Sequence, residues 1–186
     1  MARLPARPLR MLPQPNKGIE APRKAGHDRC CLQHCTLQNC GNYTETHMSA
    51  SAWSLHSTLE KDTINIGDLP LSRVLVIKDA NYPWLLLVPR RPDAIEIIDL
   101  SEIEQAQLTT EINRVARALK EITKPDKLNI AALGNVVPQL HVHIIARRTS
   151  DAAWPRPVWG VVPPLAHDPQ EVETFIAALR RKIWLS

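Results

Sequence analysis

The sequence predicts an α+β domain in which an antiparallel sheet of about five strands packs against two main helices. The first observation is the order of the predicted elements after Trp53, which is strands, helix, strands and helix, with loops as short as those of hairpins. The second is the lack of a glycine-rich phosphate turn or a series of β-α-β crossovers, which argues against a doubly wound parallel sheet.

Three strands are predicted before the first helix, because β-branched and other apolar residues fill short runs between turn residues. They cover residues 64–68, 73–78 and 84–88. The loop at 79–83 contains Asp, Asn and Pro, and it is short enough to join the second and third strands as an antiparallel hairpin. Two further strands are predicted at 128–133 and 140–146.

Two helices are predicted from their start signals and apolar spacing. The first begins after Ser101, a good N-cap, carries Glu102 and Glu104 in its first turn and runs to about residue 122. The second begins at Asp168-Pro169, since Asp caps well and proline suits the first helical position, and it ends near residue 185.

The first 50 residues differ in composition from the rest. Residues 1–48 contain 7 of the 23 Lys/Arg and 3 of the 19 Asp/Glu, so the remaining residues contain 16 of each and the formal charge of +4 lies in the leader. A neutral domain with a scattered basic leader does not indicate a nucleic-acid surface. No apolar run approaches the roughly 20 residues of a membrane span. We therefore expect a cytoplasmic protein with neither nucleic-acid nor membrane partners.

The leader also contains all four cysteines, at positions 30, 31, 35 and 40, together with two nearby histidines. Thiolates and imidazoles are zinc ligands, but the spacing matches no paired Cys-x-x-Cys arrangement. We expect residues 1–50 to be a disordered basic leader rich in proline, followed by the domain at 51–186. An alternative interpretation is that Met48 is the start of the chain and that the preceding residues are not native.

The residues that carry chemistry lie on the last predicted strand. Side chains alternate along a strand, so Gln139, His141 and His143 share one face, spaced about 6.5–7 Å apart, while Leu140 and Val142 face the core. Two interpretations follow. The His-x-His pair could hold zinc or iron with a third ligand. Alternatively, one neutral imidazole could attack a phosphate while the second, as a cation, stabilises its oxygens.

The segment QLHVHIIARR resembles the motif of the histidine triad (HIT) superfamily, in which three histidines alternate with apolar residues. LLLVPRRPDAIEIIDLSEIEQ is similar to the strand, basic turn and helix of its fragile-histidine-triad branch, and LNIAALGN resembles the strand and loop before the triad. Trp154-Pro155 resembles the Trp-Pro element of the nucleotide-binding branch. The resemblance covers residues 60–160.

The resemblance implies a nucleotide phosphoester or phosphoanhydride hydrolase, or a nucleotidyl transferase, related to diadenosine polyphosphate hydrolases. It implies that His141 is the nucleophile, that His143 contacts the phosphate, and that Gln139 lies on the leaving-group side. It also implies phosphate contacts from Gly134 and Asn135, a homodimer, and no metal or other cofactor in the chemical step.

The sequence departs from the pattern of the family at Gln139, at Trp84 and at Val136, where many members have Ser or Thr. Gln139 replaces the first histidine, and glutamine can donate a hydrogen bond but cannot deliver a proton near pH 7. Trp84 stands where the fragile-histidine-triad branch has histidine. We expect Trp84, Trp154 and Arg147 to contact substrate, although packing for the tryptophans and plain solvent exposure for the arginine are open alternatives. A nucleotide-binding module that has lost turnover is the alternative function.

Overall fold

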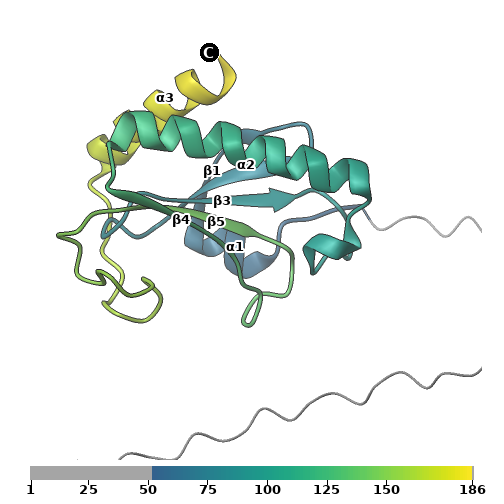
Figure 1. Ribbon diagram of the computed structural model, residues 1–186, viewed down its shortest axis with the longest axis horizontal. Helices are drawn as coiled ribbons and strands as arrows, with labels where there is room; N and C mark the ends of the chain where they lie inside the picture. Colours follow the sequence, from purple (N-terminus) through teal and green to yellow (C-terminus); the bar gives the residue numbers. More distant parts are fainter. Residues whose placement is uncertain (1–51, 186) are drawn as a thin grey trace, which may run out of the picture. The chain divides into compact units, whose positions relative to one another are not determined.

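The computed structural model describes residues 52–185, so the predicted leader, its cysteines and the alternative start at Met48 lie outside the described residues. The elements follow in the order α1 (Ser57–Asp62), β1 (Thr63–Asp68), β2 (Ser72–Ile77), β3 (Trp84–Pro89), the 3-10 helix η1 (Ile97–Asp99), α2 (Glu102–Thr123), β4 (Lys127–Ala132), β5 (Val142–Arg147) and α3 (Pro169–Trp184) (Figure 1). None of the described helices is long and apolar enough to cross a membrane.

The five strands form one antiparallel sheet in the order β1-β2-β3-β5-β4, which confirms the predicted α+β class. The predicted hairpin is β2–β3, in which Val74 pairs with Leu87. β5 lies between β3 and β4, in the interior of the sheet. The strand that carries His143 is therefore fixed by hydrogen bonds on both sides.

The helices begin as their capping residues predict. In a capping box, Ser101 accepts from the backbone N–H of Glu104, while the Glu104 side chain accepts from the backbone N–H of Ser101. Asp168 accepts from the backbone N–H groups of Gln170 and Glu171 at the start of α3. α1 is not predicted by the sequence, since six residues are too few to show helical periodicity.

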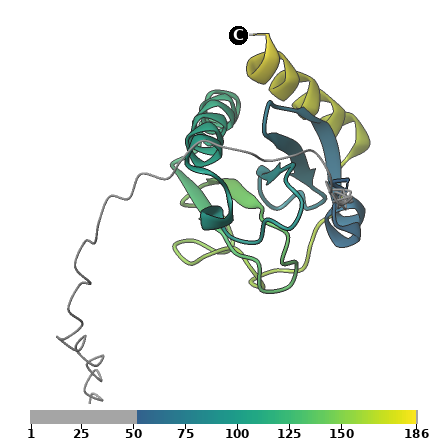
Figure 2. The ribbon, with the colours of Figure 1, turned by 90° about the vertical axis from the view of Figure 1, so that its right-hand side faces the viewer.

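The sheet has a hydrophobic core on each face. Leu85, Val142 and Ile144 belong to the cluster that α2 and α3 cover, whereas Leu86 and Ile145 belong to the cluster on the opposite face. Figures 1 and 2 show α2 and α3 together on one side of the sheet and α1 on the other. The long connection between β5 and α3 lies on the same side as α1. The face that carries the histidines is thus packed and does not form an open polar surface.

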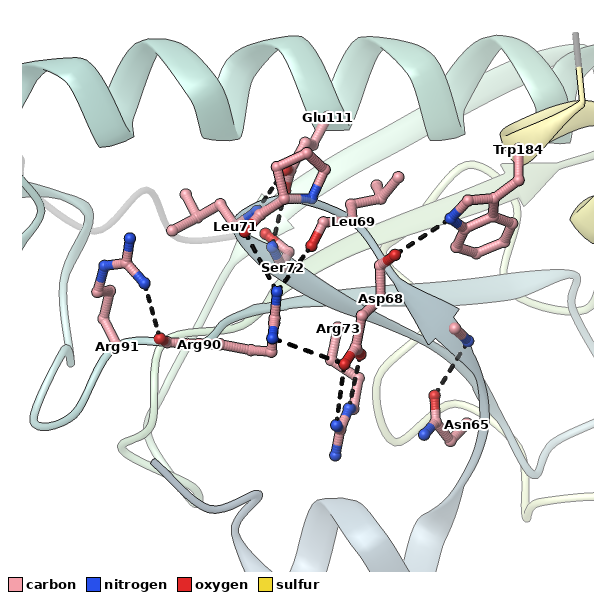
Figure 3. A network of polar contacts seen from close by, with 12 residues as sticks. Asn65, Asp68, Leu69, Leu71, Ser72, Arg73, Arg90, Arg91, Glu111 and Trp184 are labelled. Atoms are coloured by element: carbon pink, nitrogen blue, oxygen red, sulfur yellow. Dashed lines mark hydrogen bonds and ion pairs between the residues drawn. The ribbon is translucent and has the colours of Figure 1, made fainter. Parts of the chain in front are cut away.

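A buried carboxylate ties α2 to the turn between β1 and β2. Glu111 is 2% exposed and accepts from the backbone N–H groups of Leu71 at 2.7 Å and Ser72 at 2.9 Å. Figure 3 shows this contact beside the Arg90 guanidinium, which donates to the Leu69 and Pro70 carbonyls. The two N–H groups have no ladder partner at the turn, so Glu111 satisfies donors that burial would otherwise leave unpaired.

We expect Glu111→Ala to lower the free energy of unfolding by about 2–4 kcal/mol, since two buried N–H groups lose their acceptor. The measurement is urea denaturation followed by circular dichroism. The matched control is Glu121→Ala on the same helix, whose ion pair with Lys182 is about half exposed, and this change should cost much less. Equal losses for the two variants would contradict a structural role for Glu111.

Candidate active site

Two histidines lie together on the middle of the sheet. His143 is on β5, and His141 is in the extended segment just before it, so their side chains lie on the same face with ring centroids 4.9 Å apart. Each is only 6% exposed. The sequence predicted the shared face, but it did not predict this degree of burial.

The tautomer of His141 is fixed by a backbone carbonyl. Its Nδ1 lies 2.7 Å from the Gln139 carbonyl oxygen. A carbonyl can only accept, so Nδ1 carries the proton and donates it. In the neutral ring, the lone pair is therefore on Nε2. A lone pair on a ring that is held in one orientation is what a nucleophile requires.

His143 has the opposite arrangement. The indole Nε1 of Trp84 lies 3.0 Å from His143 Nδ1, and because an indole N–H can only donate, this Nδ1 carries the lone pair. The proton of the neutral ring is therefore on Nε2. Burial, and then the charge of His141, lower the pKa of His143 from 6.5 to about 4. The structure therefore favours a neutral His143 over the cationic second imidazole that the sequence left open.

The pair combines two functions that phosphate chemistry needs. One ring offers a lone pair and its neighbour offers an N–H; His143 lies on β5, an interior strand of the sheet, and His141 lies in the segment directly before it. A phosphate placed between them could receive a nucleophile at phosphorus and a hydrogen bond at an oxygen. The geometry therefore fits covalent catalysis at phosphorus better than a simple packing role.

Gln139 has partners that the sequence did not predict. Its side-chain oxygen accepts from the backbone N–H of His56 at 2.9 Å, and its side-chain nitrogen donates to the Ser54 carbonyl at 2.9 Å. The amide thus fastens the segment before α1 beside the histidines. A contact between Gln139 and a leaving group would require the amide to share or release one of these partners.

A cavity of about 380 Å³ lies next to Gln139. Its walls are the segment before α1, the loop after β3 and Gln139 itself; the lining residues are Ala52, Trp53, Ser54, Pro92, Asp93, Ala94, Ile95 and Gln139. The cavity is therefore on the side of the site where the resemblance expects a leaving group.

Trp159, which the sequence did not mark, contacts the rings of both His143 and Trp84. Its ring centroid is 5.2 Å from that of His143 and 5.6 Å from that of Trp84, and both contacts are edge-on. It lies on the connection between β5 and α3 and is 37% exposed. No local pattern marked this position, since Trp154-Pro155 was the stronger motif in the same loop.

The structure overturns the interpretation of Arg147 as an exposed residue at the end of a strand. Its side chain is 1% exposed and pairs with Asp151 through two contacts of 2.7 and 2.9 Å, while a third N–H donates to Asn129. The guanidinium also lies 5.9 Å from the Tyr82 ring centroid and 5.8 Å from that of Trp154. These partners explain Arg147 as a structural residue, so we do not include it among the proposed substrate contacts.

The other residues that were predicted to contact substrate differ in their exposure and contacts. Gly134 is half-buried and Asn135 exposed in the loop between β4 and β5 that leads directly to the histidines. Trp154 is 39% exposed, whereas Trp84 is 8% exposed and directs its N–H to His143. Trp84 therefore acts on the second imidazole, and Trp154 presents more surface to a ligand.

The metal hypothesis needs a third ligand beside the two imidazoles. Within residues 52–185, no group of three or more His, Cys, Asp or Glu side chains is placed to hold an ion. Of the two other histidines in this range, His56 caps α1 and His167 contacts the Ile77 carbonyl. The hypothesis gains no support from this part of the chain.

Comparison with known proteins defines the class. The HIT domain model matches residues 58–150, and a histidine triad protein of Bradyrhizobium japonicum is 83% identical with a TM-score of 0.71, a match that covers 72% of this chain and 99% of that one. The chain belongs to the HIT family, as its motif predicted. A histidine triad protein of Sinorhizobium meliloti is 44% identical with a TM-score of 0.69, covering 72% of this chain and 98% of the other.

A more distant relative has a named activity. A protein of Mycobacterium tuberculosis called AP-4-A phosphorylase is 30% identical over 99 residues, which are 47% of this chain and 50% of that protein. The chain thus spans about half the length of the curated relatives that it matches.

We expect Gln139→Ala to release the segment before α1. The His56 amide loses its acceptor, and one hydrogen bond of about 1 kcal/mol corresponds to roughly fivefold faster hydrogen exchange at that amide. Exchange measured by NMR tests this, with the Gly67 amide, which donates to the Asn65 side chain, as the internal control. Unchanged exchange at His56 would show that the hydrogen bonds of the Gln139 side chain do not hold the segment.

We expect Asp151→Asn to lower the free energy of unfolding at pH 7 by about 3 kcal/mol, because a buried guanidinium loses its counter-charge. The hydrogen bonds from Arg147 are the main cause that lowers the pKa of Asp151. Its contribution is therefore complete above the unfolded-state pKa of about 3.9 and is lost as the pH falls through the lower folded-state pKa.

The measurement is thermal and urea unfolding between pH 2 and 7. The gap between wild type and variant should close in acid. Asp68→Asn is the matched control, because Asp68 makes a similar paired contact with Arg73 but its side chain is 35% exposed. A gap that does not depend on pH would contradict the assignment.

Proposed function

We propose that the protein is a nucleotide hydrolase or nucleotidyl transferase that works through a covalent nucleotidyl intermediate on His141. The observation that carries the proposal is the pair of opposite tautomers, with a lone pair on His141 Nε2 beside an N–H on His143 Nε2. Membership of the HIT family and the similarity to AP-4-A phosphorylase support a nucleotide substrate.

In the proposed first step, His141 Nε2 attacks the α-phosphorus. An N–P bond forms, the P–O bond to the leaving group breaks, and the leaving oxygen keeps the electron pair. His143 Nε2 donates a hydrogen bond to a non-bridging oxygen. The ring of His141 becomes positively charged, and the Gln139 carbonyl, still bound to its Nδ1–H, stabilises that charge. In the second step, the oxygen of water or of another acceptor bonds to phosphorus as the N–P bond breaks. The electron pair of that bond returns to His141 Nε2, and the proton of the acceptor leaves to solvent.

The leaving group is proposed to be an acidic one, such as a nucleoside phosphate. Gln139 cannot deliver a proton, and its amide is engaged by Ser54 and His56. A group that departs as a stable anion needs no proton, so the phosphates of a dinucleotide polyphosphate suit the site. The cavity beside Gln139 offers a place for it. Gly134 and Asn135 are proposed to contact phosphate, and Trp154 to contact the base.

A second copy of the chain is the proposed partner. β4 is an edge strand with no fully buried residue, and apolar side chains near it are exposed: Ile130 at 48%, Leu133 at 41% and Val136 at 89%. An unpaired edge with exposed apolar groups favours pairing with another strand. Light scattering during size-exclusion chromatography tests for the homodimer, and a monomer at micromolar concentration would refute it.

The direct test is to trap the intermediate. The protein is mixed with a diadenosine polyphosphate labelled at the α-phosphate and quenched in alkaline denaturant, which preserves N–P bonds. Wild type should retain the label on His141, identified by mass spectrometry of the peptide. His141→Ala should bind the nucleotide but retain no label, with turnover reduced at least a thousandfold, because removal of a nucleophile costs at least that much.

Two outcomes decide between the alternatives. Tight binding without labelling or turnover in wild type would indicate that the protein is a nucleotide-binding module and not an enzyme. Labelling that persists in His141→Ala would place the nucleophile elsewhere. His143→Ala is the matched variant, since it removes the donor and keeps the nucleophile, so it should label more slowly but still on His141.

A further inference from the structure

We propose that Trp84 is a positioning residue that fixes His143 as a neutral hydrogen-bond donor with its proton on Nε2. The inference deepens the proposed function, on which it rests, by assigning how the second imidazole acts. It begins from the register between β3 and β5. Trp84 pairs with Ile145 and Leu86 pairs with His143, so Trp84 is the diagonal neighbour of His143 on the same face. Diagonal neighbours lie within reach of large aromatic side chains.

The hydrogen bond between Trp84 and His143 can run in one direction only. Trp84 Nε1 donates to His143 Nδ1 at 3.0 Å, and the rings are tilted by 55° with centroids 5.5 Å apart. Histidine at position 84 could donate or accept, whereas the indole N–H can only donate. A proton on His143 Nδ1 would point directly at that N–H. Protonation of His143 would therefore require the hydrogen bond to break inside a site where Trp84 is 8% exposed.

The surroundings of His143 do not favour a cation. His141, from the segment before β5, is the titratable group that acts on it, and it opposes a second positive charge. β3 contributes Trp84, and the connection between β5 and α3 contributes Trp159; neither side chain titrates. His143 thus has no carboxylate beside it among these contacts.

The fixed tautomer limits the chemistry that His143 can perform. His143 can hydrogen-bond an oxygen of the phosphate through Nε2, but it cannot relay a proton, since its other nitrogen faces a group that accepts none. The titration of His143 would then contribute little to the pH dependence of catalysis. Substitutions at Trp84 should alter the tautomer of His143 before they alter its position.

The test is NMR of ¹⁵N-labelled histidines in the ligand-free protein, which does not depend on whether the protein turns over a nucleotide. Between pH 5.5 and 8, wild-type His143 should show an Nε2-protonated neutral ring throughout. In Trp84→Phe, which keeps an aromatic ring and loses the N–H, the ring should populate both tautomers at pH 7. The protonation midpoint should rise by about one pH unit, as expected for loss of one hydrogen bond.

Trp159→Phe is the matched control, because it changes a second aromatic contact to His143 without removing a hydrogen bond to it; the tautomer should stay on Nε2. Kinetics give a second readout, in which kcat of Trp84→Phe falls at pH 7, because part of the His143 population has no proton on Nε2, while KM is unchanged. A wild-type proton on Nδ1, a midpoint above pH 6 in wild type, or the same tautomer in Trp84→Phe would each overturn the proposal. Dispersed amide spectra would show that the variant is folded.

Discussion

The hydrogen-bond register between β3 and β5 is the constraint on which the site depends. It places Leu86 opposite His143 and Trp84 one diagonal step away. If β3 shifted by one residue, Trp84 would turn to the face that α2 and α3 cover, because side chains alternate along a strand. The register is in turn specified by apolar residues on both faces of β3, which is buried along its whole length. The same register therefore determines both the packing of the two cores and the geometry of the site.

The two imidazoles differ through their neighbours and not through their own chemistry. His141 faces a carbonyl and must donate from Nδ1, while His143 faces an indole N–H and must accept at Nδ1. Each ring therefore presents a different Nε2 to the site. Burial reinforces the assignment by penalising the charged form of His143. A ring with its lone pair on Nε2 and a ring with its proton on Nε2 thus arise from the same residue type two positions apart.

The sequence predicted what local patterns can encode. Alternation placed His141 and His143 on one face, capping residues placed α2 and α3, and a short polar loop predicted the β2–β3 hairpin. Other features depend on contacts between distant segments. Gln139 binds backbone groups 83 and 85 residues away, and no spacing rule connects them. The sequence did not predict the burial of Arg147, because the turn that brings Asp151 back onto it has no repeating pattern.

The central claim is that transfer to His141 proceeds without a proton donor on the leaving-group side. The direct measurement is kcat/KM for a series of adenylyl substrates whose leaving groups span a pKa range from about 4 to 10. The account predicts a steep fall in rate as the leaving-group pKa rises, and a polyphosphate leaving group among the best. A rate independent of leaving-group pKa would contradict the account, since it would require a general acid that neither Gln139 nor His143 can supply.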